Sequence, residues 1–262
     1  MKLIDHDLHV HTYLSACCHD REGQTPERIR AAAAAGGVRT IGLADHVWAN
    51  PDVPASAWYA PQTIDRLVAM RRDVPRQAAG VRVLVGCEAE TIAPGVFGIT
   101  PDAAACVDFV QLACSHFHMT EFVAQPASAR PRDLADHALA FFRSAAGSGL
   151  ATVIPHPFLT LGFQEVIPAM VAAISDGQFT DAFGVAAERG VGIEITVGYL
   201  ANAPRRDAAL RLLTLAKQAG CRFSFGTDAH EPAALARLGE LAFFADALDL
   251  AEHDLLPLAR GV

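Results

Sequence analysis

Seven short apolar runs recur along this 262-residue chain, and stretches with helical character lie between them. The runs span residues 3–8, 40–44, 81–86, 109–115, 151–155, 192–196 and 222–226. Short, mostly apolar strands that alternate with helices are typical of a parallel sheet buried on both faces. Seven such units in a chain of this length favour an α/β fold with a closed or nearly closed barrel. No linker or composition break is present, so we expect residues 1–262 to form a single domain.

Helix signals separate the runs. In TPERIRAAAAAGG, Thr25 is suited to the N-cap, Pro26 to the first helical position, and Gly36 or Gly37 to the end of the helix. Further helices are predicted over residues 61–79, 131–148, 164–175, 179–189 and 205–220.

Composition argues against several classes of function. The formal net charge is −8 and the 21 Lys and Arg residues are dispersed, which disfavours binding of extended nucleic acid. No run of about 18 apolar residues predicts a membrane span, and the first residues lack the long apolar core of a secretory signal. The six cysteines form no CxxC pair, so we expect reduced thiols and a cytoplasmic protein.

The polar residues at the ends of the runs carry the functional signal. His9 and His11 in DLHVHT are two positions apart in an extended segment, so both imidazoles project from one face. An isolated HxH is equally well explained by a solvated strand end. The later runs, however, also end in or contain acids and histidines, namely Asp45, His46, Glu88, His116, His118, His156, Glu194, Asp228 and His230.

In a parallel barrel, the carboxyl ends of all strands converge on one face. Titratable groups gathered there would repel one another or lose hydration energy unless cations held them together. Nitrogen and oxygen ligands without a cysteine quartet suit zinc, manganese or iron in an open catalytic site. The sequence therefore predicts a metal centre.

The motifs DLHVHTYLS, GLADH, GCEAE, SHFH, IPHP and GTDAH lie in this order between residues 5 and 230. Together they resemble the PHP (polymerase and histidinol phosphatase) family of phosphoesterases. The resemblance implies a distorted seven-stranded (βα) TIM-like barrel that holds two or three divalent transition-metal ions. By position it assigns His9, His11, Glu88 and Asp228 to a first metal, His46 and His230 to a second, and Glu88, His116 and His156 to a third.

Two loops extend this assignment. Members of the family often supply the second metal with one more ligand shortly after the HxH. Here the segment SACCHDREG offers Cys17, Cys18, His19 and Asp20, among which we favour His19. A Pro-rich loop after the second run carries Trp48, Trp58 and Tyr59, and it either walls the substrate pocket or packs on the rim of the barrel.

Further residues have expected supporting roles. We expect Asp45 to orient a ligand, and Glu194 either to orient a ligand or to pair with another acid inside the barrel. His118 is expected at the rim, where it would contact substrate. Arg205 and Arg206 either clamp a phosphate or form an ordinary helix surface.

These features predict metal-dependent hydrolysis of a phosphate ester, with a small phosphomonoester such as histidinol phosphate or a nucleotide as substrate. Clustered metals would make hydroxide available near neutral pH. We expect Glu88 and Asp228 to be the catalytic carboxylates, with Asp228 or a histidine supplying the proton to the leaving oxygen.

Three alternatives stay open. A metal-dependent amidohydrolase often bridges its metals through a carboxylated lysine, but this chain offers only Lys2 and Lys217, so Glu88 would have to take that place. A PHP-type exonuclease is disfavoured by the acidic charge. A non-catalytic metal-binding regulator would need closed coordination shells that leave no room for substrate.

Overall fold

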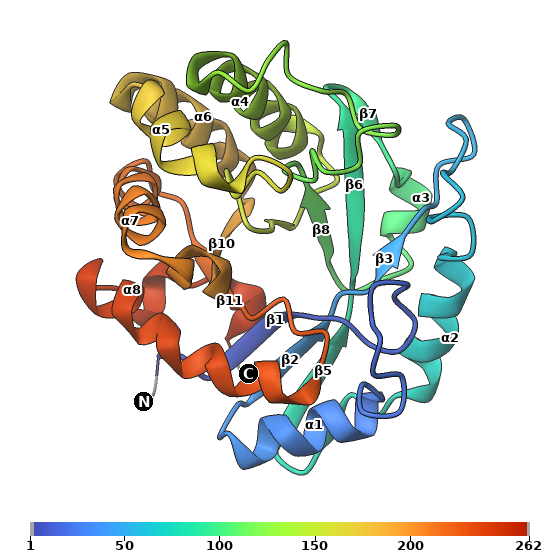
Figure 1. Ribbon diagram of the computed structural model, residues 1–262. Coiled ribbons are helices and arrows are strands. Elements are labelled where there is room, and N and C mark those ends of the chain that lie inside the picture. The colour runs from blue at the N-terminus through green and yellow to red at the C-terminus, as the bar shows by residue number, and fades with distance from the viewer. Residues whose placement is uncertain (1–2, 261–262) are drawn as a thin grey trace.

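The computed structural model describes residues 3–260 as an α/β fold, with the strands at its centre and the helices around them (Figure 1). A first sheet has the strand order β1-β2-β5-β4. Its members are β1 (His6–Val10), β2 (Thr40–Leu43), β4 (Gln77–Ala78) and β5 (Val81–Val85). The pairings β1–β2 and β2–β5 are parallel, as the alternation of strands and helices predicts, and only the short β4 is antiparallel.

A second sheet has seven strands, and its path runs β11-β10-β9-β8-β6-β3. Its members are β3 (His46–Val47), β6 (Cys87–Ala93), β7 (Val96–Phe97), β8 (Val110–Ala113), β9 (Val153–Ile154), β10 (Gly192–Thr196) and β11 (Phe223–Gly226). Every pairing along the path is parallel, and β7 pairs antiparallel with β6.

The chain passes from the first sheet to the second at two places. One lies between β2 and β3, and the other at Gly86, between β5 and β6. A side chain at Gly86 would place its Cβ 2.5 Å from the ring of Phe109, so the close packing at this crossing requires glycine. Val10, the last residue of β1, and Ala229, which follows β11, form an isolated parallel bridge.

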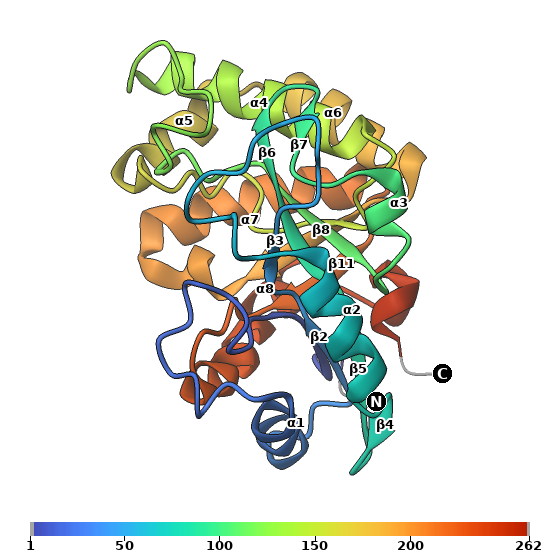
Figure 2. The same ribbon diagram turned by 90° about the vertical axis from the view of Figure 1, so that its right-hand side faces the viewer.

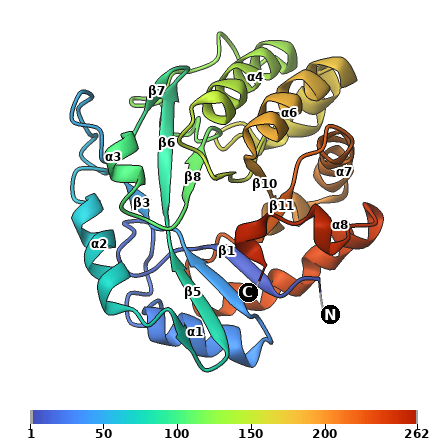
Figure 3. The same cartoon turned by 180° about the vertical axis from the view of Figure 1, so that it is seen from behind.

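Eight α-helices surround the strands in the described part of the chain (Figures 2 and 3). They are α1 (Pro26–Ala35), α2 (Ile64–Asp73), α3 (Pro101–Ala104), α4 (Pro131–Gly147), α5 (Ile167–Ala173), α6 (Asp176–Arg189), α7 (Ala203–Gln218) and α8 (Ala242–Ala247). Thr25 caps α1 as predicted, accepting from the backbone N–H of Arg28. Helix α2 is shorter than the predicted 61–79, because Pro75 disfavours helical backbone at Val74.

Apolar packing between the helices and the strands fixes this arrangement. Between α4 and α6, for example, the rings of Phe142 and Phe183 meet edge to face at 5.2 Å, and Phe158 stacks on Phe142 at 5.1 Å. Each fully buried phenylalanine of this kind contributes roughly 1.5–3 kcal/mol of burial free energy. Among the described residues, no helix is long and apolar enough to cross a membrane.

Candidate metal centre

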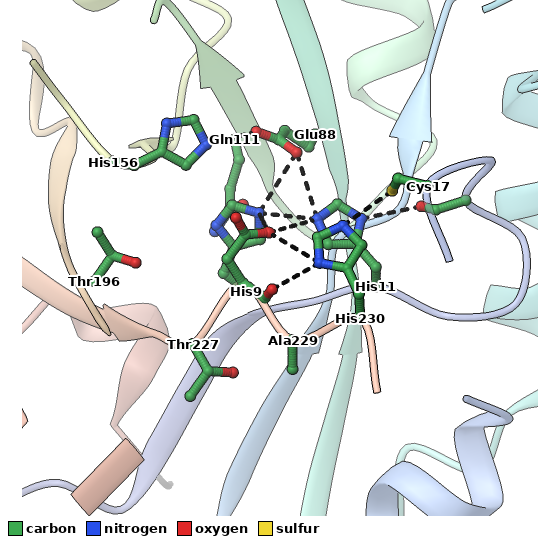
Figure 4. A network of polar contacts seen from close by, with 12 residues as sticks. His9, His11, Cys17, Glu88, Gln111, His156, Thr196, Thr227, Ala229 and His230 are labelled. Atoms are coloured by element: carbon green, nitrogen blue, oxygen red, sulfur yellow. Dashed lines mark hydrogen bonds and ion pairs between the residues drawn. The ribbon is translucent and has the colours of Figure 1, made fainter. Parts of the chain in front are cut away.

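The predicted ligands come together around the carboxylate of Glu88 on β6 (Figure 4). Glu88 Oε2 lies 3.5 Å from His9 Nε2, 3.5 Å from His11 Nε2 and 3.3 Å from His46 Nδ1. The HxH of β1 therefore faces the same carboxylate oxygen as the histidine that begins β3.

The other oxygen of Glu88 faces a second group of histidines. Glu88 Oε1 lies 3.0 Å from His156 Nε2 and 3.6 Å from His116 Nε2. One buried carboxylate thus separates five imidazoles into two sets, one set on each oxygen. This is the arrangement expected of a carboxylate that bridges two cations.

Asp228 and His230, which follow β11, complete the cluster. Asp228 Oδ1 lies 3.0 Å from His11 Nε2 and 3.4 Å from His9 Nε2. His230 Nδ1 lies 2.8 Å from the backbone oxygen of Asp228, and its ring stacks on that of His11 at 4.3 Å. The side chain of Asp228 is 37% exposed, so it is the acid of the cluster that solvent or a ligand can reach.

Hydrogen bonds at Nδ1 set the tautomers of the β1 histidines. His9 Nδ1 lies 2.8 Å from Glu194 Oε1, and a carboxylate can only accept, so the proton is on Nδ1. His11 Nδ1 lies 3.0 Å from Ser15 Oγ, which donates its own proton to Asp45 Oδ1 at 2.7 Å. In the neutral form of either imidazole, Nε2 would therefore carry the lone pair and face the centre. Supporting carboxylates hold metal-bound histidines in the same way.

His116 and His156 likewise face Glu88 through Nε2 and pair with other groups through Nδ1, whereas His46 does not. His116 donates from Nδ1 to Glu90 Oε2 at 2.6 Å, and His156 Nδ1 pairs with Ser115 Oγ at 2.8 Å. The exception is His46, which faces Glu88 through Nδ1 rather than Nε2.

Two observations test whether these residues fit a metal ion. The Nε2 atoms of His9 and His11 lie 3.1 Å apart, and two lone pairs repel at that distance unless a cation or a proton lies between them. His46 is 8% exposed, burial holds its pKa well below the usual range, and its Nδ1 has no hydrogen-bond partner among the described residues. A divalent cation would satisfy both features.

Within residues 3–260, four sets of three side chains could hold such an ion. In each set the candidate ligand atoms all lie within 4.8 Å of one another. The sets are His9–Glu88–His156, His9–His11–Asp228, His11–His46–Glu88 and His11–Cys17–His230.

The electrostatics of the site show how strongly it attracts positive charge. Burial disfavours a charged imidazole at His9, yet the carboxylate of Glu194 helps to raise its pKa well above the usual range. Burial acts likewise on His116, whose pKa Glu90 helps to raise to about 9. Burial would raise the pKa of Glu88, but the surrounding histidines hold it well below its usual range. The carboxylates therefore stay ionised, and their charge must be balanced by protons or by metal ions.

Backbone conformation supports a functional role for two of these residues. Asp228 has φ 54° and His156 has φ 32°, and both values lie in the left-handed region that side chains other than glycine rarely adopt. Such strain persists only where the surroundings impose it, and it clusters at functional sites. Both residues lie at the carboxyl ends of strands, where they face the cluster.

Glu194 and Asp45 support the histidines of the cluster through hydrogen bonds. Glu194 on β10 contacts His9 and accepts from the backbone N–H of His156 at 2.6 Å. Its contacts are those of an orienting group, one of the two roles predicted for it. Asp45 accepts hydrogen bonds from Thr12 and Ser15, and Ser15 in turn contacts His11.

The loop after β1 contributes a residue other than the one favoured from sequence. Cys17 Sγ lies 3.0 Å from His230 Nε2, whereas His19 is exposed and belongs to none of the four sets. His19 and Asp20 line a cavity of about 360 Å³ whose wall also includes Asp228 and His230. Cys18 directs its sulfur to the backbone oxygen of His230 at 3.3 Å.

The two arginines predicted as a possible phosphate clamp have local partners. Arg205 is buried and donates to the backbone oxygens of Gly198 and Gln164 at 3.5 and 3.3 Å. The guanidinium of Arg206 lies over the ring of Phe243, 4.9 Å from its centroid. These contacts favour the alternative, in which the arginines brace the start of α7 and its surface.

The aromatic loop after β3 lies beside the cluster. The ring of Trp58 meets His46 edge to face at 5.0 Å, and Tyr59 donates to Glu90 Oε2 at 3.0 Å. A cavity of about 610 Å³ opens here. It is lined by Cys17, Ser56, Ala57, Trp58, His118, Met119, Thr120, Glu121 and Phe122. His118 is one of the lining residues, and it is exposed.

Sequence reasoning missed the residues that hold the ligands. Ser15, Ser115 and Glu90 each contact the Nδ1 of a cluster histidine. The place of Glu90 could have been predicted, because it follows Glu88 by two positions and residues two apart share one face of a strand. The serines carried no signal beyond their place next to the histidine motifs.

The sequence predicts that neither lysine can bridge two metal ions, and the structure describes one of the two. Lys217 donates from α7 to the backbone oxygens of Leu248 and Asp249 at 2.9 and 2.7 Å. Lys2 lies outside the described residues. Glu88 occupies the bridging place between the two sets of histidines.

Known proteins resemble this chain in fold and not in sequence. No family model and no curated protein matches the sequence. Among solved structures, the chain is similar to histidinol phosphate phosphatase from Lactococcus lactis subsp. lactis Il1403, complexed with zinc, L-histidinol and phosphate. The identity is 14%, the match covers 93% of each chain, and the TM-score is 0.54. Dihydropteroate synthase from Thermus thermophilus in complex with 6HMPPP matches with 16% identity over 93% of this chain and 95% of that chain, with a TM-score of 0.42.

Proposed function

We propose that this protein is a metal-dependent phosphoesterase of the PHP type that hydrolyses a small phosphomonoester. One observation carries the proposal, namely the single buried Glu88 carboxylate with imidazole nitrogens of five histidines at 3.0–3.6 Å. The fold shared with a zinc-containing phosphatase structure supports it. We also infer that the strands form the distorted seven-stranded barrel of a single domain.

The ligands divide among two or three divalent ions, with zinc favoured by the nitrogen-rich donor set. His9, His11, Glu88 and Asp228 would hold the first, His46 and His230 the second, and Glu88, His116 and His156 the third. When bound, such ions polarise a phosphoryl oxygen and lower the pKa of a water molecule.

The chain's own residues contribute orientation and proton transfer. Glu194, Ser15 and Glu90 hold protons on the Nδ1 atoms and so keep the Nε2 lone pairs directed inward. The side chain of Asp228 is 37% exposed. Its partial burial acts to raise the pKa, but His9 and His11 hold the pKa far below the usual range. An ionised Asp228 can accept a hydrogen bond from the attacking water at Oδ1, and the proton for the leaving oxygen then comes from a histidine that is not bound to metal.

The adjoining cavity indicates the kind of leaving group. Trp58 and Phe122 give it an apolar wall, Glu121 adds a negative charge, and no Lys or Arg of the described chain lines it. A leaving group that is compact and uncharged or cationic fits such a wall, whereas a second phosphate does not. Histidinol phosphate and nucleoside monophosphates stay candidates, and the net charge of −8 disfavours polynucleotides.

The proposal is tested by metal analysis combined with a substrate panel. We expect two or three equivalents of transition metal, and phosphatase activity that chelation abolishes and zinc or manganese restores. The panel contains histidinol phosphate, nucleoside monophosphates, a single-stranded oligonucleotide and cyclic amides. Activity that survives verified removal of all metal overturns the proposal. Preferred hydrolysis of the amides or of the oligonucleotide assigns the site to one of the rival functions instead.

A further inference from the structure

A sulfur atom lies among the nitrogen and oxygen donors of the centre. Cys17 Sγ is 3.0 Å from His230 Nε2, and His11, Cys17 and His230 form one of the four sets of close donor atoms (Figure 4). His230 Nδ1 lies 2.8 Å from the backbone oxygen of Asp228, so its proton is on Nδ1. The Nε2 atom that faces the sulfur is therefore a lone pair.

The loop after β1 holds this sulfur in place. Two backbone hydrogen bonds, from Ser15 N to Thr12 O and from Cys18 N to Ser15 O, form consecutive tight turns at 3.1 Å each. The N–H of Ala16 donates to Gln62 Oε1 at 2.9 Å and ties the turn to the loop before α2. Cys17 thereby faces His230, while the sulfur of Cys18 is directed at a backbone oxygen.

A second observation concerns His46, which lies beside the same His11. His46 is buried, its Nδ1 has no hydrogen-bond partner among the described residues, and its ring stacks on that of His11 at 4.8 Å. The ring of His11 stacks on its other neighbour, His230, at 4.3 Å. His11 therefore contacts both of the histidines that are assigned above to the second metal.

We propose that Cys17 supplies a thiolate ligand to the metal ion held at His230, beside His11 and His46. The proposal rests on the proposed function in that this ion is one of those assigned above. On binding, the S–H bond of Cys17 breaks, a sulfur–metal bond forms, and the proton passes to solvent. A thiolate is a soft ligand, so this position prefers zinc to manganese or magnesium, unlike the positions built from imidazole and carboxylate alone.

The alternative is that Cys17 only donates a weak S–H hydrogen bond to His230. Cobalt(II) distinguishes the two, because a thiolate bound to cobalt gives a sulfur-to-metal charge-transfer band in the near ultraviolet and a thiol does not. The experiment loads the metal-depleted full-length protein with cobalt and records absorption for the wild type, Cys17→Ser, Cys17→Asp and Cys18→Ser. Cys18→Ser is the matched control, since its sulfur is adjacent in sequence and faces a backbone oxygen.

We expect the band in the wild type and in Cys18→Ser, and its loss in both Cys17 variants. Loss of partners that only hold a ligand weakens metal binding about 10–100-fold, so Cys17→Ser should weaken one zinc equivalent at least about tenfold. Cys17→Asp restores a charged oxygen ligand, so it should keep the metal count and shift the preference towards manganese.

The outcomes separate this proposal from the proposed function. Cobalt binding with phosphatase activity but no band in the wild type refutes the thiolate ligand and leaves the function standing. A band that persists in Cys17→Ser refutes it as well. A band that depends on Cys17 in a protein without phosphatase activity supports the ligand and overturns the function. Failure of the folded wild type to bind cobalt overturns both.

Discussion

Replacing Glu88 by glutamine tests the centre most directly, because Glu88 alone faces both sets of histidines. Two divalent ions about 4 Å apart repel by about 17 kcal/mol at an effective dielectric constant of 20, and bridging anions must offset this repulsion. Glutamine keeps the size of the side chain and removes its charge. We expect the loss of at least one metal equivalent and a fall in turnover of about a thousandfold, the size of effect seen when a preorganised charge-stabilising group is removed.

The assay measures metal stoichiometry and turnover on the same preparation, with circular dichroism to confirm the fold. His118→Ala is the control, because His118 follows β8 close to His116 but is exposed and lies in none of the candidate ligand sets. This variant should keep its full metal content and lose far less activity. If Glu88→Gln retained all its metal and near-normal turnover, the bridging role would be refuted. Metal loss in His118→Ala alone would show that the ends of β6 and β8 are assigned wrongly.

Three further changes probe the surroundings of the centre. A Cβ at Gly226 would lie 2.0 Å from Glu194 Oε1, so Gly226→Ala should displace that support and weaken metal affinity about 10–100-fold in a chelator competition, without unfolding the protein. Trp58→Ala should raise KM several-fold and change kcat less than twofold, if the loop binds the leaving group; a fall in kcat alone would contradict this. Burial acts to raise the pKa of Asp108, but its hydrogen bond to Arg76 helps to lower that pKa below the value of about 3.9 in the unfolded chain. The ionised carboxylate therefore stabilises the fold at pH values above the unfolded pKa. Asp108→Asn should therefore lower the free energy of unfolding by about 1–3 kcal/mol at pH 7, and urea titrations should show this difference vanishing as the pH falls through the lowered pKa.

Much of the α/β pattern was readable, because buried strands and amphipathic helices leave opposite signatures in the sequence. Each of the seven predicted runs overlaps a strand. Strands β3 and β6 were not predicted, although they carry His46 and Glu88. In CEAETIA the acids occupy alternate positions and face the centre, so no continuous apolar run marks the strand. The residues that make the site thus conceal the strand that carries it.

The ligands were more readable than the groups that hold them. Histidines at strand ends stand out because so few other polar residues interrupt the apolar runs. Ser15 and Ser115 contribute one hydroxyl each, and nothing in their spacing shows that the hydroxyl reaches an imidazole. Their role depends on three-dimensional packing, which spacing along the chain does not encode.

The turn after the HxH is a second case in which spacing along the chain does not show which side chain reaches a histidine. Cys17, Cys18 and His19 are consecutive, and side chains in a tight turn point in different directions, so a shift of one residue decides which of them meets His230. That direction is set by the hydrogen bonds of Thr12 and Ser15 to Asp45, a residue about thirty positions further along the chain. Asp45 holds the start of the turn, the turn directs Cys17 inward, and His19 is left exposed. The choice of ligand, and with it the preference for a soft metal, therefore depends on a carboxylate that binds no metal itself.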